Sequence, residues 1–177
     1  GRNGVGKTTA VNILSGNLKP NLGRYDSPPD WDEVVNFFKG TEFKSHFGKI
    51  ASGALRVSVK PQAVYLIPKV WTGKAGLLLK RFDERGVADE LIGELSLKES
   101  LDKPLNELSG GEFQRLAVAV AAARDADLYL FDEPSSYNDV FQRLAVARVI
   151  QRLAQLRRTI LLVEHDLTLL DYLSDYV

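Results

Sequence analysis

The residues at the start of the sequence could bind the phosphates of a nucleoside triphosphate. Residues 1–9 read GRNGVGKTT and match the P-loop pattern G-x-x-x-x-G-K-T. In such a loop, glycines let backbone N–H groups approach phosphates, a lysine reaches the terminal phosphates, and a hydroxyl ligates Mg²⁺. The pattern predicts an ATP site with Thr8 as a Mg²⁺ ligand. The expected nucleotide contacts are Gly1, Asn3, Gly4, Gly6, Lys7, Thr8 and Thr9.

Two neighbouring carboxylates could complete such a site. Residues 128–134 read LYLFDEP, in which an apolar run precedes Asp132 and Glu133. This is the form of a Walker B strand, whose C-terminal end faces the P-loop. We expect Asp132 to hold Mg²⁺ and Glu133 to act as general base or to position the attacking water. The alternative interpretation is an exposed acidic pair without a catalytic role.

A third motif, LSGGE at residues 108–112, precedes an Ala-rich apolar segment. Ser109 can cap a helix there, and Gly110 and Gly111 would let backbone N–H groups approach a phosphate at the helix N-terminus. One nucleotide cannot occupy this site and the P-loop of the same domain. The motif therefore predicts a sandwich, in which each LSGGE closes over the ATP of a partner domain.

Hydrophobic patterning predicts the elements that position these motifs. The apolar runs 128–131 and 159–163 are typical of parallel strands buried on both faces, and the helical segment 140–156 between them predicts a right-handed βαβ unit. A P-loop follows a strand, so a chain that begins at the loop is expected to be part of a longer domain. Further predicted elements are a helix over 8–15, a loop over 16–29, strands within 55–67, a helical stretch over 71–101 and a buried helix over 113–123.

A helix-loop-helix is predicted between the first loop and the strands. Asp30 is a candidate N-cap for a helix over 31–40, which Gly40 would end, and a second helix is expected over 41–50. Trp31, Val34, Val35 and Phe38 lie on one face of the first helix, and Phe43, Phe47 and Ile50 on one face of the second.

Composition limits the classes of protein that the chain can represent. The 177 residues are 45% hydrophobic and 26% charged, which is ordinary globular composition and argues against disorder. The formal net charge is zero, so any contact with RNA must come from a local patch. The sequence has no cysteine, which excludes thiolate metal or iron–sulfur sites within this segment. No apolar run reaches the length of a membrane span, so no membrane contact is expected.

Taken together, the P-loop, LSGGE, LFDEP and a later EHD resemble the nucleotide-binding domain of ATP-binding-cassette proteins. The resemblance implies an α/β P-loop NTPase with a mainly parallel sheet, a helical subdomain over about 68–120 and a helix-loop-helix insertion over 30–50, so that 1–177 is a partial domain. It also implies that Gln62 senses Mg²⁺ and γ-phosphate, that His165 is the switch histidine contacting the γ-phosphate, and that Asp139 crosses the dimer interface. His46 matches no motif and is expected at the surface.

A finer resemblance is to class E of that family, the ribosome-recycling ATPases, and to the first of their two cassettes. It implies ATP hydrolysis that drives ribosomal subunit splitting in the cytoplasm, with roles in termination and initiation. Implied partners are a second cassette in the same polypeptide, the small ribosomal subunit with its rRNA and protein, and release and initiation factors. An iron–sulfur cluster would lie only in an upstream domain. The segments that carry this resemblance are 17–25, 28–42, 60–69, 83–86, 108–137 and 163–177.

In class E proteins the helix-loop-helix insertion contacts the small subunit, and Lys39, Lys44 and Lys49 could meet rRNA phosphates there. A solvated helix face is the alternative for these lysines. The chain departs from the family at Arg2, where proline is usual, and at Asn138, a polar residue in place of an apolar one at the expected interface. Two other functions stay open: the ATP-binding subunit of a membrane transporter, and an ATP-gated binding module without hydrolysis.

Overall fold

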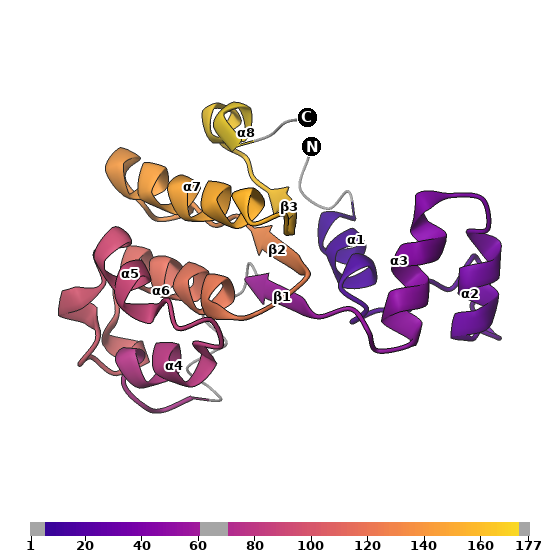
Figure 1. The fold of residues 1–177 in the computed structure, drawn as a ribbon, viewed down its shortest axis with the longest axis horizontal. Coiled ribbons are helices and arrows are strands. Elements are labelled where there is room, and N and C mark those ends of the chain that lie inside the picture. Colours follow the sequence, from indigo (N-terminus) through magenta and orange to yellow (C-terminus); the bar gives the residue numbers. More distant parts are fainter. Residues whose placement is uncertain (1–5, 61–70, 174–177) are drawn as a thin grey trace. The chain divides into compact units, whose positions relative to one another are not determined.

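The computed structural model of the chain describes residues 6–60 and 71–173. The chain forms two compact units, Gly1–Val57 and Ser58–Val177 (Figure 1). The sequence-predicted site residues Gly1, Asn3, Gly4 and Gln62 lie outside the described residues, as does the second half of the predicted strand region.

The first unit begins with the helix predicted after the P-loop. Helix α1 spans Lys7–Leu14 and follows Gly6, whose φ of 85° is a left-handed conformation that favours glycine. Val11 of this helix is buried. The predicted loop over 16–29 contains neither helix nor strand.

Two short helices, α2 (Trp31–Phe37) and α3 (Glu42–Ala51), form the predicted helix-loop-helix and lie side by side in Figure 1. Asp30 caps α2 as predicted: its side chain accepts from the Glu33 N–H, while Glu33 accepts from the Asp30 N–H. Val34 and Phe47 are fully buried between the helices. Phe43, on the same predicted face of α3, is 48% exposed, although its ring centroid lies 5.8 Å from that of Phe38 and 6.2 Å from that of Phe47.

The second unit is built on a sheet of strands β1 (Val57–Lys60), β2 (Leu128–Asp132) and β3 (Thr159–Val163), in that order. Strands β2 and β3 are parallel, and the connecting helix α7 (Val140–Gln155) completes the predicted βαβ unit. All of β2 is buried as predicted, whereas β3 is exposed or half-buried along its length. The prediction of equal burial is wrong because β3 is at the edge of the described sheet.

The helices beside the sheet pack around α6 (Gly110–Ala123), which is buried along most of its length as predicted. The predicted helical stretch over 71–101 is divided into α4 (Ala75–Phe82), α5 (Ala88–Glu94) and the short turn η2 (Lys98–Ser100), followed by η3 (Leu105–Glu107). The division occurs at Asp83, whose carboxylate accepts from the N–H groups of Val87 and Ala88 and so starts α5. The final helix, α8, spans Leu167–Leu173.

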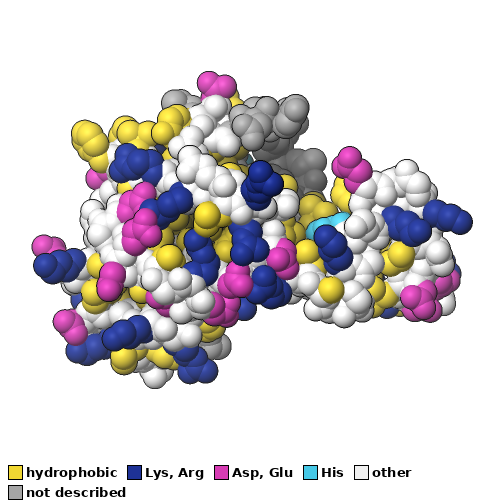
Figure 2. All heavy atoms as spheres, in the orientation of Figure 1, with side chains coloured by type: hydrophobic (Ala, Val, Ile, Leu, Met, Phe, Trp, Pro, Cys, Tyr) yellow, Lys and Arg dark blue, Asp and Glu magenta, His cyan; other side chains and the backbone are white. Residues whose placement is uncertain are grey.

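The visible face carries basic and acidic side chains interspersed over both units, in agreement with the zero net charge (Figure 2). Within the described ranges, no helix is both long and apolar enough to cross a membrane.

Candidate functional site

The ends of β2 and β3 bring two predicted site residues into contact. Parallel register pairs Asp132 with Val163, so the residues that follow each strand emerge at the same edge of the sheet. Glu133 Oε1 lies 3.0 Å from His165 Nε2, and Asp132 is 6% exposed. The structure therefore places the predicted base and the predicted switch histidine side by side, next to the predicted metal ligand.

Glu133 has an unusual backbone conformation, with φ of 48°. Its N–H donates to the Val163 carbonyl at 2.7 Å, which joins the turn after β2 to the end of β3. A residue other than glycine in this left-handed region costs about 1 kcal/mol or more and must be held by its surroundings. The site is thus built around a constrained turn.

Lys60, the last residue of β1, is fully buried beneath this turn. Its ammonium donates to the carbonyls of Asp132, at 2.7 Å, and Glu133, at 3.0 Å. Burial lowers the pKa of Lys60 to about 8, against the opposing effect of the carboxylates of Asp132, Glu133 and Glu164. Sequence reasoning missed Lys60; the available signal was a lysine two residues after Ser58 on the inward face of a strand.

Glu164 joins the loop after β2 to the loop after β3. Its carboxylate accepts from the Ser135 hydroxyl at 2.6 Å and from the Ser135 N–H at 3.3 Å. The same carboxylate accepts from the backbone N–H of His165 at 2.8 Å. This residue therefore fixes the backbone of the predicted switch histidine, a role that sequence reasoning also missed although Glu164 lies within the EHD motif.

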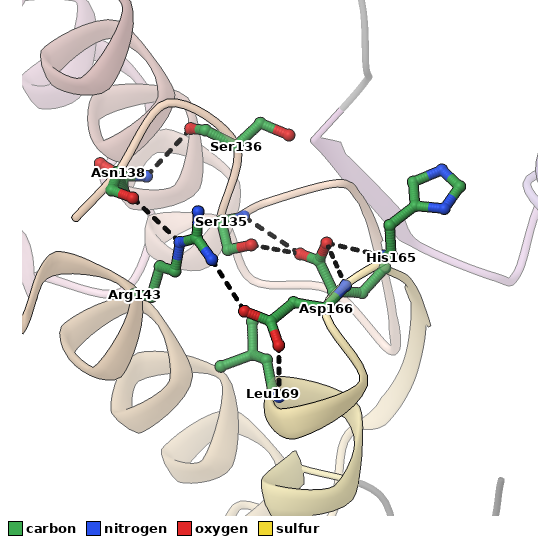
Figure 3. A network of polar contacts seen from close by, with 8 residues as sticks. Ser135, Ser136, Asn138, Arg143, His165, Asp166 and Leu169 are labelled. Atoms are coloured by element: carbon green, nitrogen blue, oxygen red, sulfur yellow. Dashed lines mark hydrogen bonds and ion pairs between the residues drawn. The ribbon is translucent and has the colours of Figure 1, made fainter. Parts of the chain in front are cut away.

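Arg143 of α7 makes a second connection between the same loops (Figure 3). It donates from Nε to the Asn138 carbonyl at 2.9 Å and from a terminal nitrogen to Asp166 at 2.8 Å. Asp166 in turn accepts from the Leu169 N–H in the first turn of α8. The loop containing Ser135–Asn138 is consequently joined to the loop after β3 at two points, directly through Glu164 and indirectly through Arg143.

The LSGGE motif forms the helix start that was predicted. The Ser109 side chain accepts from the Glu112 N–H, and Glu112 accepts from the Ser109 N–H at 2.8 Å. Glu112 also accepts from the Ser100 hydroxyl and from the Lys103 ammonium, each at 2.8 Å. The Lys103 contact and the Ser109 N–H lower the pKa of Glu112 to about 2.

The glycines of this motif pack against the loop after β2. A Cβ atom on Gly111 would lie 2.8 Å from the Tyr137 carbonyl oxygen, and one on Gly110 would lie 3.3 Å from the Tyr137 ring. Asn138, in the same loop, is 5% exposed and its side-chain oxygen accepts from Arg115 of α6 at 3.0 Å. The polar group that the sequence places at the expected interface is therefore bound by Arg115 within the chain.

Asp139 is exposed and caps α7. Its carboxylate accepts from the Gln142 N–H at 2.9 Å, and Gln142 accepts from the Asp139 N–H at 3.2 Å. Asp139, which is predicted to cross the interface, therefore also stabilises the start of α7, a role that its motif did not indicate.

The remaining predicted residues belong to the first unit. Lys7 and Thr8 are the first residues of α1, and Thr9 is exposed. Among the described residues there is no group of three or more His, Cys, Asp or Glu that could hold a metal. The carboxylate of Asp132 nevertheless suits Mg²⁺, which is usually held by one or two protein oxygens together with substrate phosphates. His46, expected at the surface, is half-buried there, with Nε2 2.9 Å from the Leu14 carbonyl oxygen.

Comparison with known proteins agrees with this geometry. The family model described as "ABC transporter" matches residues 1–136. The chain is 47% identical to "ABC transporter E family member 1" of Arabidopsis thaliana and 45% identical to "Translation initiation factor RLI1" of Saccharomyces cerevisiae. Each match covers the whole chain but only 29% and 30% of those proteins.

Solved structures give the same result. The structure called "RNase-L Inhibitor" superposes with a TM-score of 0.93 at 51% identity, over 98% of this chain and 33% of that one. The archaeal ribosome recycling factor aABCE1, solved in complex with the ribosomal stalk protein aP1, gives a TM-score of 0.93 at 50% identity over the same shares. The predicted α/β fold of an ABC-type P-loop NTPase is confirmed, and the chain belongs to the ATP-binding-cassette family.

Proposed function

We propose that the chain is the first cassette of a class E ATPase, which binds and hydrolyses MgATP to drive ribosome recycling in the cytoplasm. The observation that carries the chemical part is the contact of Glu133 with His165 beside Asp132. The names of the relatives support the biological part, since they include a ribosome recycling factor and translation initiation factors.

In this proposal the P-loop binds the triphosphate, with Lys7 at the terminal phosphates. Thr8, Asp132 and Gln62 hold Mg²⁺, which stabilises the charge that develops during phosphoryl transfer. Glu133 accepts a proton from the attacking water or orients it. His165 contacts the γ-phosphate and, through the 3.0 Å contact, keeps the Glu133 carboxylate in one orientation. The further nucleotide contacts of this loop are Gly1, Asn3, Gly4, Gly6 and Thr9.

A second cassette in the same polypeptide would complete the active site. Ser109, Gly110 and Gly111 would close over its nucleotide, and Asp139, which is exposed, would cross the interface. Because the chain spans about a third or less of its relatives, we assign this second cassette, and the iron–sulfur cluster of an upstream domain, to the parts of such a protein outside the chain.

The helix-loop-helix would bind the small ribosomal subunit. Lys39, Lys44 and Lys49 are all exposed, so their ammonium groups can reach rRNA phosphates. Release and initiation factors are the further partners of the proposed cycle.

The test is co-sedimentation of the whole natural protein with small ribosomal subunits, in the presence of a non-hydrolysable ATP analogue or of ADP. We expect retention with the analogue only. Glu133→Gln should lower kcat about 100-fold or more and give retention with ATP itself, because the closed state is not released by hydrolysis. The matched control, Asp89→Asn, changes an exposed acid of α5 that lies outside all the motifs and should behave as wild type.

The two alternatives give different results. A transporter subunit would hydrolyse ATP but sediment apart from ribosomal subunits in both states. If the chain is a binding module without hydrolysis, the wild-type protein would co-sediment with small ribosomal subunits when ATP is present. Glu133→Gln would then have no effect on this co-sedimentation.

A further inference from the structure

A buried lysine requires an explanation, because placing an ammonium group away from water is costly unless it is paired and hydrogen-bonded. Lys60 is 0% exposed, and its side chain points to the same face of β1 as the buried Ser58. Apolar residues fill most of the surrounding core. A methionine or leucine would fill this position without the cost of burying a charge, so the ammonium must serve a specific contact.

That contact is with the backbone of the acidic pair. Lys60 Nζ donates to the carbonyls of both Asp132 and Glu133, at 2.7 and 3.0 Å, across 72 and 73 residues of sequence. Two successive carbonyls can meet one donor group only if the chain turns sharply between them. Glu133 makes this turn with its φ of 48°, and its N–H is fixed from the opposite side by Val163.

We propose that Lys60 is a positioning residue of the hydrolytic site: its ammonium holds the turn at Asp132–Glu133, and thereby keeps the Glu133 carboxylate beside His165. Without this donor, each of the two carbonyls would lose a hydrogen bond, although the Glu133 carbonyl would still accept from the Ser136 N–H at 3.4 Å. Glu133 could then relax to an ordinary φ. Its carboxylate would then leave the position, 3.0 Å from His165 Nε2, that the constrained turn provides.

The charges around Lys60 fit this role. Three carboxylates act on its ammonium, those of Asp132, Glu133 and Glu164, and each opposes the effect of burial on its pKa. The ammonium of Lys60 is thus a positive charge among negative ones. It therefore also reduces the mutual repulsion of acidic groups gathered at the strand ends.

The inference rests on the proposed ATP hydrolysis, and steady-state kinetics of the whole natural protein test it. Lys60→Met keeps the length of the side chain and removes the donors, whereas the control Ser58→Ala removes a hydrogen bond to the Ala121 carbonyl from the same face of the same strand. We expect Lys60→Met to lower kcat about tenfold or more with the KM for ATP within about threefold, because misplacement of a catalytic group slows the chemical step. Ser58→Ala should keep kcat within about twofold.

A double-mutant cycle separates positioning from general loss of structure. If Lys60 acts through Glu133, adding Lys60→Met to Glu133→Gln lowers the residual rate no further. A multiplicative loss in the double variant would overturn the inference, as would a kcat for Lys60→Met equal to that of Ser58→Ala. If Lys60→Met does not fold, Lys60→Gln takes its place with the same expected results, since its shorter amide cannot reach both carbonyls.

The outcomes distinguish the inference from the proposed function. A wild-type protein that hydrolyses no ATP overturns both. A wild-type protein that hydrolyses ATP and loses activity with Glu133→Gln, but not with Lys60→Met, overturns only the role of Lys60.

Lys60→Arg keeps the charge and the donors, and should recover part of the kcat that Lys60→Met loses.

Discussion

Two turns in the second unit carry candidate site residues, and the chain holds them by different means. Partners remote in sequence hold the turn at Glu133: Lys60 lies 73 residues before it, and Val163 follows on another strand. Near neighbours hold the turn at Ser109–Glu112, since Ser100 and Lys103 lie 12 and 9 residues before Glu112. The first turn can form only once the sheet has assembled, whereas the second can form with its own helix.

A side-chain hydrogen bond between Arg115 and Asn138 links these two regions. Asn138, in the loop after β2, accepts from Arg115, one turn into the helix that Ser109 caps. Tyr137 of the same loop covers Gly110 and Gly111. A change in the conformation of either turn can therefore affect the other through these contacts. Substitutions at this junction show how strongly the locally held turn depends on the remotely held one.

The largest effect on stability is expected for Gly111→Ala. Its Cβ would lie 2.8 Å from the Tyr137 carbonyl oxygen, so backbone must move, at a cost of about 2–3 kcal/mol in the free energy of unfolding. Gly93→Ala is the matched control, because Gly93 is exposed in α5 with no atom within 4 Å of an added Cβ. There we expect a gain of about 0.5–1 kcal/mol from helix propensity. Chemical denaturation of both variants measures the two changes in the free energy of unfolding, which should have opposite signs. Equal changes would show that the loop around Tyr137 can move at no cost.

A smaller effect is expected for Asn138→Leu, which introduces the apolar residue that the family usually has. The substitution removes the acceptor of Arg115, itself 6% exposed, and should cost about 1–2 kcal/mol. Asn138→Asp keeps an acceptor at the same place and should retain more of the stability. The same denaturation experiment checks both variants. A Leu variant as stable as wild type would mean that Arg115 finds another acceptor, and that the two turns are not linked through this bond.

The comparison of the two turns also explains which features could be predicted from sequence. The Ser109 cap, the Asp30 cap and the start of α1 were correct because each depends on residues within a few positions. The apolar run of β2 likewise identified the acidic pair at its end. Local signals thus located the candidate site residues and most of the elements that carry them.

The missed features depend on contacts between distant segments. Periodicity places Lys60 on a strand face, but does not say that two carbonyls from another strand lie opposite. The same applies to Glu164, whose partner Ser135 lies 29 residues earlier, and to Asn138, whose burial depends on Arg115. The family resemblance placed Asn138 at the expected interface, and only the assembled loop shows what its side chain binds.

The smallest effect in this series is expected at Glu112, the centre of the locally held turn. Its pKa is about 2 in the folded chain, below the ordinary value of 4.5, because the Lys103 ammonium and the Ser109 N–H stabilise the carboxylate. A lowered pKa means that the unfolded state binds the proton more readily, so this contribution is complete above pH 4.5 and is lost as the pH falls toward 2.

Glu112→Gln should therefore lower the free energy of unfolding at pH 7 by about 1 kcal/mol, a value kept small by solvent screening of the ion pair with Lys103. Below pH 4.5 the difference between wild type and variant should shrink, because protonation removes the same interaction from the wild-type chain. Urea unfolding measured from pH 7 down to pH 2.5 follows this difference. The control Asp102→Asn removes the exposed partner of Lys74 and should leave the curve close to wild type, since exposed ion pairs contribute little. A difference between Glu112→Gln and wild type that stays constant with pH would assign its effect to packing, and the turn would then be held by its helix cap alone.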